Sequence, residues 1–319
     1  MINCDSCKVA FVGAGYMTTE HIKAFKDVPG VALAGIHSRT QARAEALALE
    51  SGVATVCGSI SELYDKTQAA LVVISVPELS VGDVCLEAFK YPWACLIEKP
   101  AGYDVTDAEQ ILYVAQQLGR QAYVALNRRQ HSSTHLVLKE MNQCEGVRLI
   151  HVYDQQDQIA ARIAGQPELV VKNWMYANSI HLVDYFNTLG RGNIVSVTPV
   201  IHWNPDNPQF VMAKLTYDSG DIGIYEAVWN APGPWAVTVT TQEKRWEMRP
   251  LEQAMVQPHG SRKLDPIKTH EWDHLFKPGL RLQAEEAVKA AMGQPSKLAT
   301  LDDAMKSMKL VQAIYGNGY

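Results

Sequence analysis

A glycine turn and a later lysine are the residues of this chain whose types and spacing suggest chemistry. Gly13-x-Gly15 stands between an apolar stretch and a helical stretch. Gly13 permits a tight turn, and Gly15 lets the backbone approach a pyrophosphate at the N-terminus of the helix. Lys99, within Glu98-Lys99-Pro100, ends a later apolar stretch and can reach the same edge of a parallel sheet. This order predicts a bound dinucleotide with a lysine near its reactive end.

The end of the second predicted strand bears on which dinucleotide is bound. Thr18 stands where the usual fingerprint has Gly or Ala, a position that mainly serves helix–sheet packing. The strand ends in His37-Ser38-Arg39, without the acidic residue that holds ribose hydroxyls in NAD sites. Ser38 can donate to a phosphate, and Arg39 can pair with it or stack on adenine, unless Arg39 is simply a solvated turn residue. We expect NADP or NAD, with NADP favoured.

The first part of the chain alternates between strand and helix patterns. Strands are predicted at 8–12, 31–37, 54–56, 69–76, 94–97 and 121–126, and helices at 16–26, 40–50, 79–89 and 106–118. Continuous apolar runs are typical of strands buried on both faces, and β–α alternation indicates a doubly wound parallel sheet in an α/β fold. We assign residues 1–126 to a dinucleotide-binding domain.

The pattern changes after Asn127. Helices are predicted at 133–141, 178–189, 280–292 and 301–315, and alternating strands at 148–153, 194–202, 210–217, 222–229, 236–241 and 244–248. The alternating runs, with a hairpin turn at Ser219-Gly220, predict an open and mostly antiparallel sheet in an α+β domain. We assign residues 127–319 to this domain, which would bind the substrate and mediate oligomerisation.

Composition and charge exclude several classes of partner. The chain has 319 residues, 47% of them hydrophobic, and a net charge of -5 without a basic stripe, which argues against a nucleic-acid partner. Its apolar runs are too short to span a membrane, and the N-terminus lacks a signal-peptide layout, so a cytoplasmic location is expected. Cys4 and Cys7 form a C-x-x-C pair without a second pair, and we expect reduced thiols and no metal.

The chain resembles the Gfo/Idh/MocA oxidoreductases, named for glucose–fructose oxidoreductase and inositol dehydrogenase. The resemblance covers nearly the whole chain and is carried by 12–17 (Val-Gly-Ala-Gly-Tyr-Met), 73–77 (Val-Ile-Ser-Val-Pro), Glu98-Lys99-Pro100, Asn127-Arg128-Arg129 and 181–184 (His-Leu-Val-Asp). It implies a Rossmann domain followed by an open antiparallel-sheet domain. It also implies hydride transfer between a nicotinamide cofactor and a secondary alcohol of a sugar, sugar nucleotide or cyclitol.

The resemblance implies roles for individual residues. Lys99 would be catalytic and would polarise the substrate oxygen, and His181 would carry its proton, a task that suits an imidazole because imidazoles titrate near neutrality. Cofactor-binding candidates are Gly13, Gly15, Tyr16, Met17, Ser38, Arg39, Ser75, Val76, Pro77, Glu98 and Lys99. Substrate-binding candidates are Asn127, Arg128, Trp174, Tyr176, Asn178 and His181. Asp184, three residues after His181, would share its helix face.

One position departs from the family pattern. The family usually has an aspartate four residues before the histidine, and this chain has Ala177 there. Either His181 and Lys99 suffice, or Tyr176 substitutes, or the protein is not a standard dehydrogenase. The alternatives are a non-catalytic cofactor-binding regulator and an NAD-dependent glycosidase that oxidises its sugar transiently.

An apolar sheet face predicts assembly with further copies of the chain. The residues expected on this face are Val195, Val197, Val211, Val228, Trp229 and Val237. Helices would cover one side of the sheet and a second subunit the other. We expect a homodimer or homotetramer that acts on a small-molecule substrate.

Overall fold

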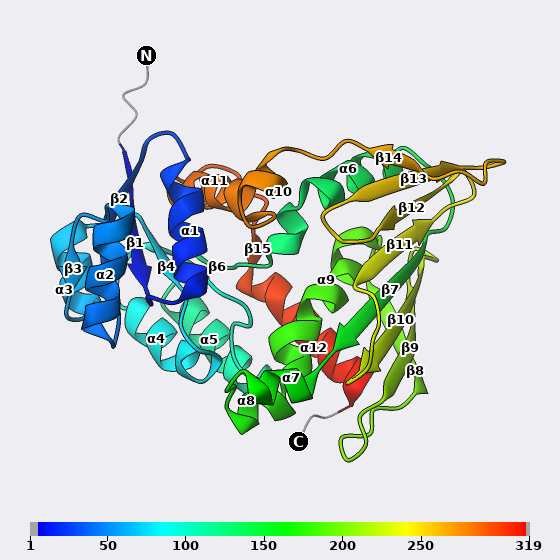
Figure 1. Cartoon of the computed structure of the whole chain (residues 1–319), viewed down its shortest axis with the longest axis horizontal. Coiled ribbons are helices and arrows are strands. Elements are labelled where there is room, and N and C mark those ends of the chain that lie inside the picture. The colour runs from blue at the N-terminus through cyan, green and yellow to red at the C-terminus, as the bar shows by residue number, and fades with distance from the viewer. Residues whose placement is uncertain (1–5, 317–319) are drawn as a thin grey trace. The chain divides into compact units, whose positions relative to one another are not determined.

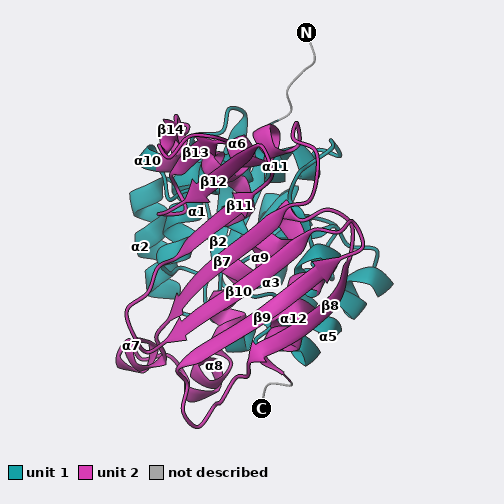
Figure 2. Cartoon of the chain, turned by 90° about the vertical axis from the view of Figure 1, so that its right-hand side faces the viewer, with its two compact units in different colours: residues 1–127, 274–305 teal, residues 128–273, 306–319 magenta. Residues whose placement is uncertain are grey.

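The computed structural model describes residues 6–316, and the chain divides into two compact units (Figure 1, Figure 2). Unit 1 comprises residues 1–127 and 274–305, and unit 2 comprises residues 128–273 and 306–319. The change in strand and helix pattern after Asn127 predicts that all later residues form the second domain, whereas 274–305 belong to unit 1. The reason is the apolar face of one helix in this segment, which completes the core of unit 1.

The sheet of unit 1 contains, within the described residues, seven strands in the order β15-β6-β5-β4-β1-β2-β3. Their bounds are β1 Cys7–Val12, β2 Val31–His37, β3 Val56–Cys57, β4 Leu71–Ile74, β5 Ala94–Ile97, β6 Ala122–Val124 and β15 Ala299–Thr300. All neighbours are parallel except β15, which runs antiparallel to β6. The predicted doubly wound parallel sheet is confirmed, and its strand order reverses between β1 and β4.

The helices of unit 1 alternate with these strands. Their bounds are α1 Tyr16–Lys26, α2 Gln41–Ser51, α3 Ile60–Thr67, α4 Val81–Ala88 after the short η1 Glu78–Ser80, α5 Val105–Gln117 and α11 Leu280–Ala291. Helix α3 was not predicted, although its capping signal is present in the sequence. The Ser59 side chain accepts a hydrogen bond from the Glu62 backbone N–H at 3.0 Å, and Glu62 accepts one from the Gly58 N–H at 2.6 Å.

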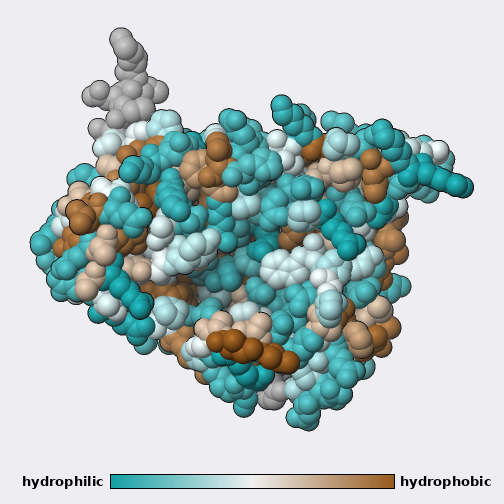
Figure 3. Space-filling view, viewed as in Figure 1, coloured by the Kyte–Doolittle hydropathy of each residue, from teal (hydrophilic) through white to brown (hydrophobic). Residues whose placement is uncertain are grey.

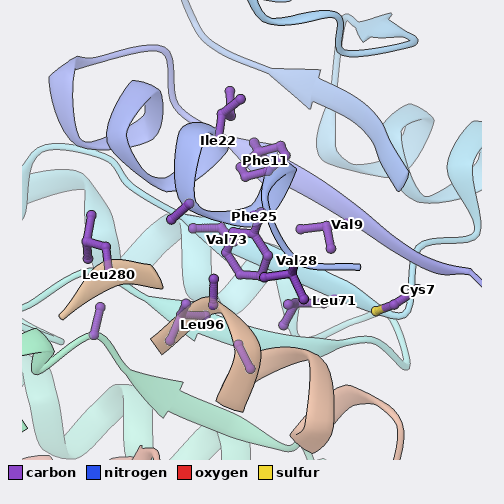
Figure 4. Packing of buried hydrophobic residues seen from close by; sticks show 14 of the residues in the cluster. Cys7, Val9, Phe11, Ile22, Phe25, Val28, Leu71, Val73, Leu96 and Leu280 are labelled. Atoms are coloured by element: carbon purple, nitrogen blue, oxygen red, sulfur yellow. The ribbon is translucent and has the colours of Figure 1, made fainter. Parts of the chain in front are cut away.

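The core of unit 1 lies between β1, β4, β5, α1 and α11 (Figure 4). Phe11 and Phe25 meet edge to face with ring centroids 6.1 Å apart, and both are completely buried. Val73 and Leu96 belong to the same cluster, as does Leu280 of α11. Burial of both faces of β4 and β5 explains why their sequences are continuous apolar runs.

The sheet of unit 2 has, within the described residues, eight strands in the order β14-β13-β12-β11-β7-β10-β9-β8. Their bounds are β7 Leu149–Gln156, β8 Ile194–Ile201, β9 Phe210–Tyr217, β10 Ile222–Trp229, β11 Ala236–Thr240, β12 Lys244–Met248, β13 Ala254–Pro258 and β14 Asp265–Ile267. The predicted mostly antiparallel sheet is confirmed, but β10 and β7 pair in parallel. Strands β13 and β14 were not predicted, because both are short and lack clear alternation.

Helices cover one face of this sheet and leave the other face open (Figure 2). The remaining helical segments are η2 Asn127–Gln130, α6 Ser132–Met141, α7 Gln158–Ile163, α8 Glu168–Lys172, the π-helix η3 Met175–Ser179, α9 Ile180–Leu189, α10 Trp272–Leu275 and α12 Leu301–Tyr315. Within unit 2, α9 packs on β7. Strands β7, β9 and β10 therefore alternate between buried and partly exposed residues.

The prediction that one face collects all six apolar residues named above is wrong. Val211, Trp229 and Val237 are buried on the helix-covered face, whereas Val195 is 63% exposed. Val228 and Trp229 are neighbours in β10, and successive side chains of a strand point to opposite faces. The open face instead mixes apolar and charged side chains.

The described residues show no feature that would indicate a metal or a membrane. Within 6–316, no group of three or more His, Cys, Asp and Glu side chains is arranged to hold a metal ion. No helix of this part of the chain has the length and apolar character needed to cross a membrane. Apolar side chains form separate patches on the face shown in Figure 3. Cys4, one member of the predicted thiol pair, lies outside the described residues, and Cys7 is buried.

Candidate cofactor and substrate sites

The turn after β1 brings together residues from three neighbouring strands. Gly13 has a φ of 113°, and a Cβ atom built on it would lie 1.9 Å from the Ser75 carbonyl oxygen. Only glycine fits this position. The Gly13 N–H donates to the His37 carbonyl and the Ser75 N–H donates to the Val12 carbonyl, both at 2.8 Å. The ends of β1, β2 and β4 thus meet at the point of the sheet where parallel-sheet folds bind ligands.

The N-terminus of α1 has the features of an anion site. Gly15 is the N-cap, and no heavy atom lies within 4 Å of a Cβ built there. Among the described residues, no side chain caps this helix, and its first turn has no acidic residue. Thr18 is completely buried and packs against Gly13, as the packing role of the third fingerprint position requires. The uncovered backbone N–H groups of Tyr16 and the residues that follow suit a pyrophosphate.

The segment before α11 lies beside the start of α1. Lys277 Nζ is 5.4 Å from the centroid of the Tyr16 ring, within the range of a cation–π interaction. Asn127 Nδ2 donates to the Pro278 carbonyl at 2.9 Å, which fixes the segment at the end of β6. The sequence analysis predicts that Asn127 binds the substrate. In the structure, its amide nitrogen is used for the hydrogen bond to Pro278.

Ser38 and Arg39 follow β2 directly. Ser38 is half-buried and its Oγ accepts from the Thr40 N–H at 3.4 Å, whereas Arg39 is exposed. Both residues lie next to the Gly13 turn, because the preceding residue, His37, accepts the Gly13 N–H.

Glu98 and Lys99 follow β5, and a buried histidine holds the glutamate. The Glu98 N–H donates to the Ile74 carbonyl at 2.8 Å, so the tripeptide begins beside the end of β4. Glu98 Oε1 lies 2.7 Å from Nε2 of His21 on α1, and both side chains are at least nine-tenths buried. Glu98 Oε2 accepts from the Lys99 N–H at 3.2 Å. His21 was missed from the sequence, although its spacing of three from Thr18 puts both on the buried face of α1.

In unit 2, most of the substrate candidates fall in one short segment. Trp174 precedes the π-helix η3, Tyr176 and Asn178 lie within it, and His181 is the second residue of α9. Tyr176 and His181 are buried and Asn178 is half-buried. The indole N–H of Trp174 has no hydrogen-bond partner among residues 6–316. Single π-turns inside helices occur often at functional sites.

The π-turn changes which residue lies one turn before His181. The Ile180 N–H bonds to the Met175 carbonyl, five residues back. The extra residue in this turn shifts Tyr176 toward the position one turn before His181, which Ala177 would occupy in a regular α-helix. The predicted helix at 178–189 therefore begins later, at Ile180.

Asp184 forms an ion pair with Arg129. Arg129 Nε and Nη2 donate to the two Asp184 carboxylate oxygens, both at 2.7 Å, and Ser307 Oγ donates at 2.6 Å. This bidentate pair anchors α9 to the segment after β6. The neighbouring Arg128 guanidinium lies 4.7 Å from the centroid of the Trp235 ring.

The structure thus gathers the sequence candidates into one group in each unit. In unit 1, Gly13, Gly15, Ser75, Glu98 and Lys99 adjoin one another at the carboxyl edge of the sheet. In unit 2, Trp174, Tyr176, Asn178 and His181 share one segment. Ser75, Val76 and Pro77 link β4 to η1, and Met17 lies in the first turn of α1.

Comparison with known proteins identifies proteins that are similar to this chain in sequence and fold. Residues 7–126 match the GFO_IDH_MocA family, described as an oxidoreductase family with an NAD-binding Rossmann fold. The chain is 23% identical over 239 residues to 4-carboxy-2-hydroxymuconate-6-semialdehyde dehydrogenase of Sphingobium sp. (strain NBRC 103272 / SYK-6), covering 71% of this chain and 73% of that protein.

Two solved structures share the fold along almost the whole chain. UDP-N-acetylglucosamine 3-dehydrogenase from Acidithiobacillus ferrooxidans has a TM-score of 0.78 at 16% identity, covering 97% of each chain. Levoglucosan dehydrogenase in complex with NADH and levoglucosan has a TM-score of 0.81 at 15% identity, covering 98% of this chain and 96% of that one. The two-domain architecture is therefore shared at low sequence identity.

Proposed function

We propose, from the premise that the chain is an NAD-binding oxidoreductase of the Gfo/Idh/MocA family, that it oxidises or reduces a sugar, sugar nucleotide or cyclitol. The reacting group would be a secondary alcohol or the corresponding ketone. The position of the Glu98-Lys99 backbone beside the Gly13 turn supports the proposal, because the Lys99 side chain would start next to a dinucleotide bound at this edge of the sheet. The names of two structural relatives, which act on levoglucosan and on UDP-N-acetylglucosamine, support a polyhydroxylated substrate.

The residues would divide the chemistry between them. The bound nicotinamide supplies a hydride acceptor or donor. Lys99 would polarise the substrate oxygen and stabilise the negative charge that grows on it. His181 would accept the hydroxyl proton during oxidation and return it during reduction. Both side chains must reach one substrate oxygen for this mechanism to operate.

The test of this mechanism is the variant Lys99→Ala. We expect kcat to fall by roughly 10²–10³, the cost of losing one group that stabilises an oxyanion. Cofactor affinity should change little, because the charge on the oxygen grows in the transition state. The measurement is nicotinamide absorbance with levoglucosan, myo-inositol and UDP-N-acetylglucosamine as probes. Lys90→Ala, which removes an exposed lysine of unit 1, is the control. Full turnover in a Lys99→Ala, His181→Ala double variant would overturn the mechanism.

We propose that Tyr176 takes the part of the missing acid at Ala177. The π-turn supports this, because its extra residue shifts Tyr176 toward the position one turn before His181. Tyr176→Phe should then lower kcat, whereas Ala177→Asp should not raise it. A clear gain of activity in Ala177→Asp would instead identify a dehydrogenase weakened by loss of the acid. Absence of turnover in all variants and in the parent would favour the regulator.

NADP is the proposed preferred cofactor. Ser38 and the exposed Arg39 follow β2, where a ribose phosphate would lie, and the turn has no acidic residue. Arg39→Ala should weaken NADP binding and leave NAD binding unchanged in calorimetry. Equal losses for both cofactors would exclude a role in binding the phosphate.

A homodimer or homotetramer is the proposed assembly. The open face of the unit 2 sheet supports this, since Phe210, Ile201 and Leu149 are exposed on strands there. Light scattering at micromolar concentration tests it, and a monomer would contradict it.

A further inference from the structure

A buried carboxylate lies close to the segment 174–181 of unit 2, which contains most of the substrate-binding candidates. Asp154 is on β7, is 2% exposed, and faces the helix-covered side of the sheet. Gln156, two residues later, points to the same side because side chains in a strand alternate. The Asp154 carboxylate accepts hydrogen bonds from neutral groups, the Tyr225 hydroxyl and the Gln156 amide.

The donors around Asp154 can be assigned without ambiguity. Tyr225 Oη donates to Asp154 Oδ2 at 2.7 Å, and Tyr225 and Tyr315 hydroxyls are 2.6 Å apart. Burial raises the pKa of Tyr225 well above its usual value and also raises that of Tyr315, so both keep their protons. Since the single proton of Tyr225 goes to Asp154, the Tyr315 hydroxyl donates to Tyr225.

The other carboxylate oxygen sets the orientation of an amide. Gln156 Nε2 lies 2.5 Å from Asp154 Oδ1. A carboxylate only accepts hydrogen bonds, so Gln156 must turn its NH₂ group toward Asp154 and its Oε1 away. Asn178 Nδ2 then donates to Gln156 Oε1 at 2.8 Å. Each amide has one orientation, because the opposite orientation would place two acceptors or two donors face to face.

We propose that Asn178 is a specificity-determining residue, which presents its Oδ1 as a hydrogen-bond acceptor to a substrate hydroxyl or amine. Asp154 and Gln156 are positioning residues, because the hydrogen bonds from Asp154 through Gln156 orient the Asn178 amide. Asn178 uses one amide hydrogen on Gln156, which fixes the orientation of the amide and leaves Oδ1 as its side-chain acceptor, next to a second amide hydrogen. It lies in the π-turn between Trp174 and His181 and is half-buried. The substrate class in this inference rests on the proposed function. The hydrogen bonds that link Asp154, Gln156 and Asn178 are independent of it.

The selectivity that follows is for a donor at one position of the substrate. A hydroxyl can donate to Asn178 Oδ1, whereas a deoxy or O-methyl group cannot. Loss of one such neutral hydrogen bond costs about 1 kcal/mol, which is roughly a fivefold to tenfold loss of affinity. We therefore expect the effect in KM and much less in kcat.

The orienting hydrogen bonds between Asp154, Gln156 and Asn178 can be tested by nuclear magnetic resonance without any substrate. In ¹⁵N-labelled protein, Asp154→Asn should shift or broaden the Asn178 side-chain NH₂ signals, because an uncharged amide at 154 permits both orientations of Gln156. Asn178→Asp identifies the signals by their disappearance. Asn187, whose Nδ2 donates to Ser307 Oγ at 2.9 Å, is the internal control and should not move. Should Asp154→Asn fail to fold, Gln156→Met breaks the same chain and should give the same shift.

The functional arm uses levoglucosan, myo-inositol and UDP-N-acetylglucosamine as probes. Asp154→Asn should raise KM for the probe that the parent turns over by roughly tenfold, while kcat and cofactor affinity stay near those of the parent. A deoxy form of that probe that binds parent and variant equally supports the role of Asn178. If no probe reacts but the Asn178 signals shift, the hydrogen-bond chain stands and the proposed function fails. Unchanged Asn178 signals in both Asp154→Asn and Gln156→Met overturn the inference, whatever the activity.

Discussion

Glu98 in unit 1 and Asp154 in unit 2 are both buried carboxyl groups directly behind candidate site residues, yet their partners differ. Glu98 Oε1 lies 2.7 Å from Nε2 of His21, which belongs to a different secondary-structure element, α1. Asp154 faces the Tyr225 hydroxyl and the Gln156 amide. The first arrangement joins α1 to the end of β5. The second fixes the orientation of the Gln156 amide on β7 and, through it, that of the Asn178 amide in η3.

The difference teaches what each arrangement can do. A close acid–imidazole pair holds two backbone segments together. Removing one partner lowers the stability of the fold strongly, because the other partner is left buried without it. Neutral donors around a carboxylate contribute less to the position of the backbone but leave only one way for each amide to turn. We therefore expect substitutions at Glu98 and His21 to act on stability, and substitutions at Asp154 to act on recognition.

The largest expected effect on stability comes from breaking the pair in unit 1. His21→Leu should lower the free energy of unfolding by about 3 kcal/mol, because it leaves the Glu98 carboxylate buried without its partner. The measurement is urea denaturation followed by tryptophan fluorescence. The double variant His21→Leu, Glu98→Gln should recover much of the loss, since no charge is then buried. A double variant as unstable as the single one would show that packing, and not the pair, is responsible.

A smaller effect is expected at the bidentate pair of unit 2, where the Asp184 carboxylate has a guanidinium partner. Arg129→Lys keeps the charge beside Asp184 but loses the two parallel hydrogen bonds. The free energy of unfolding should fall by about 1–2 kcal/mol. Arg162→Lys, at the exposed pair with Glu168, is the matched control and should be neutral. Equal changes at both sites would show that burial adds nothing to the Arg129 pair.

The smallest expected effect, and the one with the opposite sign, belongs to Asp154→Asn. Burial raises the pKa of Asp154, and the hydrogen bonds from Tyr225, Ser179 and Gln156 oppose that rise only in part. An acid with a raised folded-state pKa contributes stability below its unfolded pKa, about 3.9, and loses it as pH rises through the folded pKa. Relative to the parent, Asp154→Asn should therefore gain stability as pH rises from about 4 toward neutrality.

Thermal unfolding of parent and Asp154→Asn across this pH range provides the measurement. Asp206→Asn, which changes an exposed acid of the same unit, serves as the control. A variant that becomes less stable than the parent as pH rises would mean that the carboxylate stabilises unit 2, and the contrast with Glu98 would then disappear.

The parts that could be predicted from the sequence are those that depend on neighbours along the chain. Gly13 is recognisable because a tight turn between a strand and a helix demands glycine, and Lys99 because it ends an apolar strand. The buried strands β4 and β5 are legible as continuous apolar runs. These features follow from local sequence, so the domain class and the glycine turn were predictable.

The parts that could not be predicted depend on contacts between distant residues. His21 and Glu98 are 77 residues apart, and Tyr225 and Asp154 are 71 apart. Nothing in the sequence near Asp154 distinguishes it from a solvated carboxylate, because its donors come from β10, from η3 and from β7 itself. The apolar residues of the unit 2 sheet were combined into one face because strand alternation was not followed across Val228 and Trp229.

The return of residues 274–305 to unit 1 has a consequence for biosynthesis. Strand β15 pairs with β6 at the edge of the sheet, and Leu280, Ala284 and Ala287 of α11 complete the core. A ribosome that has released residues 1–127 has therefore not yet supplied everything that the nucleotide-binding unit needs. Unit 1 can finish folding only after residues 274–305 have emerged, whereas domains usually fold in order from the N-terminus during synthesis. Until then, the edge of β6 lacks a neighbour that would keep other strands away.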